Sequence, residues 1–301
     1  MRKQPRNLAA PRPLSGRLRR WSTALLVAPT VAVLVAFVVI PFLYVIRVSL
    51  ATQGPYGSIG GGWTVDNYTQ FVDYTYLRIL MYSVSLAAQN TVLCLFFGYT
   101  VAFFLAFRAG RAAPALIFLL VLPFWASFLV RMSAWMTLLS PQGVVDTALH
   151  KSLLFTGPLQ LFPSQGAVLV GLLYSFLPIA VFPLYASLRS IDVSLIEAAR
   201  DLGSGPFGVH TRVVIPLARP GIVAATLLTF APSLGVFVIP VLLGGGKKLI
   251  LGNLIVSLFL EFRNMPFGAA VSVVFFVIVM IGILASLRIM RGAGQSGRAL
   301  I

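Results

Sequence analysis

Six apolar stretches separated by polar segments set the pattern of this 301-residue chain. Each stretch is long enough for an α-helix to cross the hydrocarbon core of a bilayer, which takes roughly 20 residues. The stretches cover about 21–46, 79–107, 112–139, 166–188, 220–242 and 267–290. The pattern therefore predicts an all-α membrane protein with six transmembrane helices.

The polar segments divide the chain around these spans. The first 20 residues carry seven Lys or Arg and three Pro, which predicts a disordered basic tail. The apolar run that follows is too long for the core of a signal peptide, so we expect a retained first helix. The predicted divisions are a tail over 1–20, a first transmembrane helix and outer loop over 21–78, a main membrane domain over 79–290 with a polar loop over 189–220, and a C-terminal tail over 291–301.

The distribution of charge sets the topology. The chain is 58% hydrophobic and 10% charged, with a net charge of +16. Its basic residues flank the apolar spans instead of lining one face, so we expect contact with membrane lipid and none with nucleic acid. Of the 23 Lys and Arg, 16 fall on one side of the predicted topology and six on the other, with Arg131 inside a span. The positive-inside rule then places both termini and the 189–220 loop in the cytoplasm.

The sequence contains no recognisable catalytic set. Cys94 is the single cysteine, and the two histidines, His150 and His210, fall on opposite sides of the predicted membrane. The run 243–248 (LGGGKK) lacks the second glycine and the Ser or Thr of a phosphate-binding loop. We therefore expect no enzyme activity, no cofactor and no metal in this chain, and any ATP chemistry must belong to a partner.

The charges inside the spans bear on mechanism. The six stretches hold no Asp or Glu, which argues against a transporter coupled to protons or cations through membrane carboxylates. Arg131 either lies on a substrate path or gate, or extends to the outer surface. Nearby aromatic residues either line a cavity or form an interfacial belt. The candidate residues of the path or gate are Trp125, Arg131, Trp135, Tyr174 and Ser233.

The polar loop before the fifth span is longer than a simple connection needs. Asp192 or Ser194 can cap the start of a helix, and Gly203 suits a left-handed helix end. Pro216 is expected to stop the segment that precedes the next span. We predict a short helix-turn-helix at the membrane surface that enters a groove on a partner; an amphipathic helix without a partner is the alternative.

The residue spacing inside that loop is specific. Glu197-Ala198-Ala199 is followed after three residues by Gly203, and after nine more by Val213-Val214-Ile215-Pro216. This resembles the EAA loop of ATP-binding-cassette (ABC) importer permeases, with Val213 in place of Ile and Ile215 in place of Leu. The resemblance implies that a separate ATPase contacts Glu197, Ala198, Ala199, Arg200, Asp201, Gly203 and Pro216.

Two further segments extend the resemblance. The run Pro123-Phe124-Trp125 with Arg131 and Trp135, and the run 243–246 (LGGG), are similar to the B-type permease subunits of spermidine/putrescine importers. Met132 and Ser133 depart from that pattern. The resemblance implies a type I ABC importer (MetI-like) permease fold over most of 79–290, in a bacterial inner membrane.

The same resemblance implies the partners and the cargo. The expected partners are cytoplasmic ABC ATPase subunits, a second permease subunit that completes a heterodimer, and an extracytoplasmic solute-binding protein. The expected substrate is a polyamine such as spermidine or putrescine, or a related small solute. The alternatives are a stand-alone secondary transporter or channel that ATP does not drive, and a membrane scaffold whose loop recruits a partner without transport.

Overall fold

The computed structural model describes residues 27–151, 160–246 and 248–296. The predicted tail over 1–20 lies outside the described residues. Four helices are long and apolar enough to cross a membrane: Val27–Ser49, Tyr74–Phe107, Gln165–Arg189 and Met265–Arg288. Two bent helix pairs raise the number to as many as six if each pair counts as one span. The all-α membrane fold is confirmed, and the predicted six spans lie within this range.

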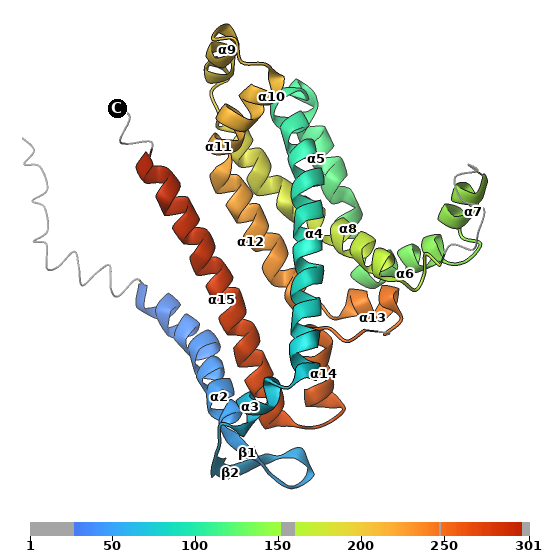
Figure 1. The fold of residues 1–301 in the computed structure, drawn as a ribbon, viewed down its shortest axis with the longest axis vertical. Coiled ribbons are helices and arrows are strands. Elements are labelled where there is room, and N and C mark those ends of the chain that lie inside the picture. Colours follow the sequence, from blue (N-terminus) through green and yellow to red (C-terminus); the bar gives the residue numbers. More distant parts are fainter. Residues whose placement is uncertain (1–26, 152–159, 247, 297–301) are drawn as a thin grey trace, which may run out of the picture.

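The elements follow one another along the chain as helices with one small hairpin between the first two spans (Figure 1). Their bounds are η1 Val35–Val39, α2 Ile40–Ser49, β1 Ala51–Gln53, η2 Pro55–Gly57, β2 Ile59–Trp63, α3 Asp66–Phe71, α4 Tyr74–Phe107, η3 Gly110–Ala112, α5 Ala113–Val121, η4 Leu122–Trp125, α6 Phe128–Leu139, α7 Val144–Lys151, α8 Gln165–Arg189, α9 Val193–Asp201, α10 Pro206–Val209, η5 His210–Val214, α11 Ile215–Leu217, α12 Arg219–Gly235, α13 Val238–Gly244, α14 Leu251–Leu260 and α15 Met265–Ser296.

Helices α4, α8 and α12 pack together and form the core of the molecule. Small side chains allow the close approach that helices in a membrane need. Ala87 and Ala102 on α4, Ala180 on α8 and Ala225 on α12 are fully buried. At Gly221 even a methyl group would overlap the carbonyl of Pro183 on α8, so α12 begins in direct backbone contact with α8.

The predicted third span, 112–139, is broken. Helix α5 continues directly into η4, which ends at Trp125. Ala126 and Ser127 are extended, and α6 then runs at 92° to the helix before the break. Pro123 lies just before this break and has no N–H for the carbonyl four residues earlier, which weakens the last turn. The predicted third span is therefore a bent helix pair and not one continuous helix.

The predicted fifth span, 220–242, is also divided. Helix α12 ends at Gly235, Val236 is extended, and α13 starts at Val238. Pro240 supplies no donor for the carbonyl of Val236, so a continuous helix would lose a bond at this point. At the last span the helix extends further than predicted, because α15 continues to Ser296.

The loop after the first span forms an antiparallel hairpin, β1 with β2, followed by α3. The Asn67 side-chain amide donates hydrogen bonds to the carbonyls of Ser49 and Ala51, at 2.9 and 3.0 Å. These two bonds fix α3 against the end of α2 and the start of the hairpin. The hairpin and helix α9 lie at opposite ends of the molecule (Figure 1).

Candidate functional site

Helix α9 projects at one end of the molecule, between the end of α8 and the start of α12 (Figure 1). Of its nine residues only Ile196 is buried. Ile196 belongs to the apolar cluster that also contains Leu188 and Val214. The helix is therefore attached to the core through Ile196, with the partly buried Ala199 packed against the same cluster, and exposes most of its surface.

The start of α9 is capped by Asp192. Its carboxylate accepts a hydrogen bond from the Ser194 N–H at 3.0 Å. This bond holds the pKa of Asp192 below its ordinary value, because it favours the ionised carboxylate. Of the two caps that the sequence left open, the structure uses Asp192.

The end of α9 is closed by Gly203, whose φ of +82° lies in the left-handed region. The Gly203 N–H donates to the carbonyl of Arg200 at 2.9 Å, and the Ser204 N–H donates to the carbonyl of Ala199 at 3.0 Å. This pair of bonds is the Schellman arrangement, which satisfies the last carbonyls of a helix. Both ends of α9 are thus fixed by local hydrogen bonds.

The residues expected to contact an ATPase lie on or beside this capped helix. Glu197, Ala198, Arg200 and Asp201 are exposed and Ala199 is partly buried. Leu202 and Phe207 add a large apolar surface, since they are 87% and 81% exposed. Neither residue was among those that the sequence singled out for this contact.

Pro216 lies apart from α9, in the second arm of the loop. The helical run α10–η5–α11 passes through Pro216 and ends one residue later, at Leu217, where the chain bends by 69° into α12, so the predicted stop lies one residue beyond the proline. The π-helical turn η5 supplies the reason: the Ile215 N–H bonds back to the carbonyl of His210, so the hydrogen-bond register is already shifted where the proline enters.

The second arm also touches the core helix α4. The His210 ring lies 4.6 Å from the Phe103 ring and 6.0 Å from the Tyr99 ring, measured between centroids. Val209 and Val214 are buried beside it. The loop is therefore joined to α4 through a ring cluster, in addition to its covalent connections to α8 and α12.

Three candidate path residues come together around the break between α5 and α6. The Arg131 guanidinium lies 4.4 Å from the Phe124 ring centroid and 5.9 Å from that of Tyr174. Trp135 packs against Tyr174 at 5.6 Å, and Phe128 lies 6.0 Å from the guanidinium. Phe124 and Phe128 were not among the expected residues, although Phe124 stands within the Pro123-Phe124-Trp125 run.

Arg131 lacks the partners that a buried arginine normally has. Its Nε and Nη1 atoms are buried and have no hydrogen-bond partner among the described residues. Such groups are rare in native proteins because each loses its bonds to water. The cation instead lies over aromatic faces, which attract it through their quadrupoles.

The other two candidates lie outside this ring cluster. Trp125 is 76% exposed and packs edge-on against Phe118 at 5.9 Å. Ser233 is buried on α12 and accepts a hydrogen bond from the Asn90 side chain on α4 at 2.8 Å. In the part of the chain that the structure describes, no group of three or more His, Cys, Asp or Glu could hold a metal ion.

Solved structures of ABC importers share this fold. The chain superposes on a subunit of a bacterial ABC transporter for the acidic polysaccharide alginate with a TM-score of 0.70 and 20% identity, over 90% of this chain and 97% of the other. The same transporter in complex with a periplasmic protein bound to an alginate pentasaccharide gives a TM-score of 0.71 at 18% identity, over 89% and 93% of the two chains. At these identities the match concerns the fold alone.

Curated relatives are closer in sequence, whereas no family model matches the chain. The spermidine/putrescine transport system permease protein PotB of Escherichia coli is 38% identical over 246 residues, 82% of this chain and 90% of PotB. PotB of Haemophilus influenzae is 39% identical over 240 residues, 80% and 84% of the two chains. The inner membrane ABC transporter permease protein YdcU of Escherichia coli is 32% identical over 213 residues, 67% and 68% of the two chains. Because these identities extend over most of both chains and the fold agrees, the chain belongs to the ABC importer permease family, in the group that contains the PotB permeases.

Proposed function

We propose that this ABC importer permease carries a polyamine across the inner membrane, and that partner ATPases bind α9 and drive this transport. The observation that supports this most directly is a short helix, capped at both ends and largely exposed, between two core helices. Glu197 and Arg200 provide polar contacts to the ATPase, Ala198 and Ala199 allow close approach, and the turn at Gly203 fixes the helix end.

A rigid helix is what such a contact requires. Binding and hydrolysis of ATP move the ATPase subunits, and only a coupling element that does not deform can pass that movement on. From α9 the movement reaches α8 and α12 through the chain, and α4 through the contacts of His210 with Tyr99 and Phe103. These three helices are the packed core, so we expect them to move together.

The membrane orientation that this mechanism needs agrees with the distribution of arginine. Helix α9, the turn after α4 and the C-terminal end of α15 share one end of the molecule (Figure 1). The arginines of the 189–219 segment that contains α9, of that turn and of that end of α15 are Arg108, Arg111, Arg189, Arg200, Arg212, Arg219 and Arg288. The positive-inside rule makes this end cytoplasmic, with both termini on the same side.

The polyamine assignment rests on the names of the PotB relatives and on the chemistry around Arg131. Aromatic faces bind ammonium groups without a carboxylate. Phe124, Phe128 and Tyr174 offer such faces, but Arg131 now occupies them and its charge repels a cation. We infer that this cluster acts as a gate, closed to cations until the rings and the arginine rearrange.

The complete importer needs further subunits. A second permease forms the other half of the path in a heterodimer, and an extracytoplasmic binding protein delivers the substrate to the end that carries the hairpin. The alginate importer solved with its periplasmic protein has subunits of the same fold, which supports this arrangement.

The test is transport by the purified complex in liposomes, with labelled putrescine or spermidine, the binding protein and internal ATP. We expect uptake that needs ATP. Glu197→Arg is expected to abolish both uptake and its stimulation of ATP hydrolysis, while the protein level in the membrane stays normal. The matched control is Glu261→Arg, the same charge reversal on an exposed residue at the other end of the molecule.

Two results would contradict the proposal. Equal uptake by both charge-reversal variants would show that α9 does not couple transport to the ATPase. Uptake driven by an ion gradient in the absence of any ATPase would favour a secondary transporter or channel.

A further inference from the structure

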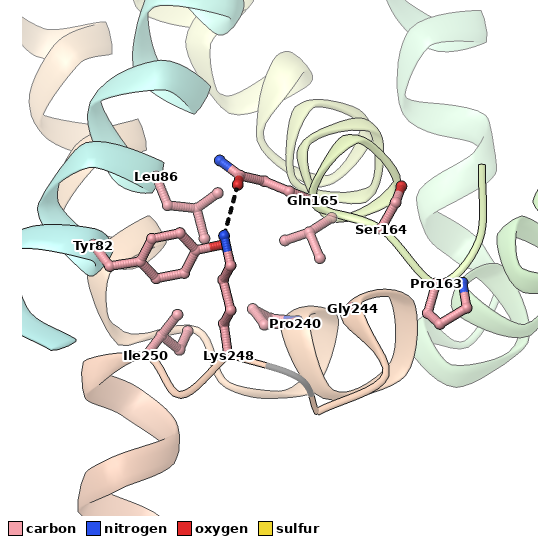
Figure 2. A pocket seen from close by; sticks show the side chains of 10 residues that line it. Tyr82, Leu86, Pro163, Ser164, Gln165, Pro240, Gly244, Lys248 and Ile250 are labelled. Atoms are coloured by element: carbon pink, nitrogen blue, oxygen red, sulfur yellow. Dashed lines mark hydrogen bonds between the residues drawn. The ribbon is translucent and has the colours of Figure 1, made fainter. Parts of the chain in front are cut away.

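A small pocket of about 120 Å³ opens near the outer end of α4, between α4, the start of α8 and the loop that joins α13 to α14 (Figure 2). Its floor is apolar, formed by Leu86, Val168 and Ile250, which are all buried. Its rim carries Tyr82 from α4 and Gln165 from α8. Lys248 reaches this rim from the loop.

The pocket already holds an ammonium group, that of Lys248. The Lys248 Nζ lies 4.8 Å from the centroid of the Tyr82 ring and 3.5 Å from the Gln165 Oε1 (Figure 2). Among the described residues that line the pocket, none carries a carboxylate. A ring face and an amide oxygen recognise a primary ammonium by cation–π attraction and hydrogen bonding.

The walls of the pocket are held independently of the lysine. The Leu251 N–H donates to the Ser83 Oγ at 2.7 Å, and the Ser164 N–H donates to the Leu243 carbonyl at 3.3 Å. These bonds fix the loop on both sides of Lys248, which is itself exposed. The lysine side chain is therefore able to leave the pocket without disturbing the residues that form it.

We propose that this pocket binds the terminal ammonium of the transported amine, and that Lys248 occupies it as a tethered competitor when substrate is absent. The proposal rests on the polyamine function proposed above. The side chain of lysine is a four-methylene chain ending in an ammonium, which is putrescine without its second ammonium. A group of that kind fits a site with an apolar floor and a Tyr–Gln rim.

The consequence is a lower apparent affinity for substrate. A ligand binds only the fraction of molecules whose site is open, so occupation by Lys248 reduces the apparent affinity in proportion. Substituting Lys248 by an uncharged residue removes the competing ammonium and leaves the pocket open to substrate.

The first test compares the apparent KM for putrescine in the reconstituted complex. Lys248→Met keeps the length of the side chain and removes its charge. We expect the apparent KM to fall by about two- to five-fold, the ratio that corresponds to a cation–π contact at an exposed site. Arg47→Met is the matched control, because it removes one exposed positive charge from the same end of the molecule and leaves this pocket intact; its KM should equal that of the wild type.

A second pair of variants tests the walls. In the Lys248→Met background, Tyr82→Leu should raise the apparent KM again, and Tyr82→Phe should not, because phenylalanine keeps the ring face. Restoring the positive charge at position 248 by chemical labelling adds a check, because the same folded variant is compared before and after labelling. Lys248→Cys modified with an aminoethyl thiosulfonate regains an ammonium and should return to the wild-type KM, whereas modification with a methyl thiosulfonate should leave the KM low.

Native Cys94 is fully buried, so labelling reports on position 248. Putrescine should also slow the labelling of Lys248→Cys. If the wild type imports polyamine and Lys248→Met has the same KM, the proposed binding site is wrong, while the proposed substrate still stands. A wild-type complex that imports no polyamine would overturn the proposed substrate, and the site with it.

Discussion

The Asn90 side chain on α4 donates a 2.8 Å hydrogen bond to the Ser233 Oγ on α12, across 143 positions of sequence. Ser233 in turn donates to the Thr229 carbonyl at 2.6 Å. Both Asn90 and Ser233 are almost completely buried. The bond therefore joins two core helices at a depth where water is not available to replace it.

Ser233→Ala should destabilise the protein, because it leaves the Asn90 amide without this acceptor. Hydrogen bonds between membrane helices contribute about 0.6 kcal/mol on average and up to about 1.7 kcal/mol, and we expect a loss of unfolding free energy in this range. Unfolding of the protein in bicelles measures it. Thr100→Val is the control, because the Thr100 hydroxyl is exposed and bonds only within its own helix. An equal loss in both variants would contradict a special role for the Asn90–Ser233 bond.

The left-handed backbone at Gly203 is the basis of a second prediction. Gly203→Val places a branched side chain at φ +82°, which costs roughly 1–2 kcal/mol for an ordinary residue, so the Schellman turn should open and α9 should fray. We expect ATP hydrolysis to continue while uptake falls strongly. The measurement is the ratio of ATP consumed to substrate imported.

A neighbouring glycine supplies the control for that experiment. Gly205 has φ −66°, and a methyl group there would meet nothing within 4 Å. Gly205→Ala should therefore keep the coupling ratio of the wild type. Gly203→Asn should fall between the two variants, since asparagine tolerates the left-handed conformation. A normal ratio in Gly203→Val would show that coupling does not need a rigid end of α9.

The Asp192 cap should make the start of α9 sensitive to pH. The Ser194 N–H lowers the pKa of Asp192 in the folded protein, so the cap stabilises α9 while the carboxylate is ionised. That contribution is present above the ordinary carboxyl pKa and is lost as the pH falls through the lowered value. Hydrogen exchange at the Ser194 amide, corrected for intrinsic rates from about pH 6 to about pH 3, should show declining protection. Asp192→Asn should remove the pH dependence; an unchanged profile would contradict the cap.

The sequence was sufficient to predict the features that depend on local chemistry. The apolar stretches located the membrane segments, and the spacing from Asp192 to Gly203 located α9, because caps and helical periodicity act over a few residues. It did not predict the break at Ala126 and Ser127. The segment stays apolar on both sides of the break, and whether a proline bends a span or divides it depends on the helices packed around it.

Contacts between distant residues were beyond the sequence for the same reason. Tyr174 lies on α8 and Arg131 on α6, and only the packing of the two helices brings the ring to the guanidinium. Lys248 and Tyr82 meet in the same way. The sequence named Trp125 among the rings that either line a cavity or form an interfacial belt, and in the structure Trp125 is exposed and packs on Phe118.

The gate formed around Arg131 is open to a direct test. Arg131→Met keeps much of the apolar volume and removes a cation whose Nε and Nη1 have no partner among the described residues. Thermal stability should therefore stay the same or rise, because removing a buried group that lacks hydrogen bonds costs nothing in lost bonds. Leak of labelled putrescine from liposomes without ATP should increase, because the charge that repels a cation is gone. Arg131→Lys keeps the charge and should keep the leak low. If Arg131→Met is stable and does not leak putrescine, the barrier to cations is formed by the rings of Phe124, Phe128 and Tyr174. If the variant is stable and leaks, the barrier is formed by the arginine.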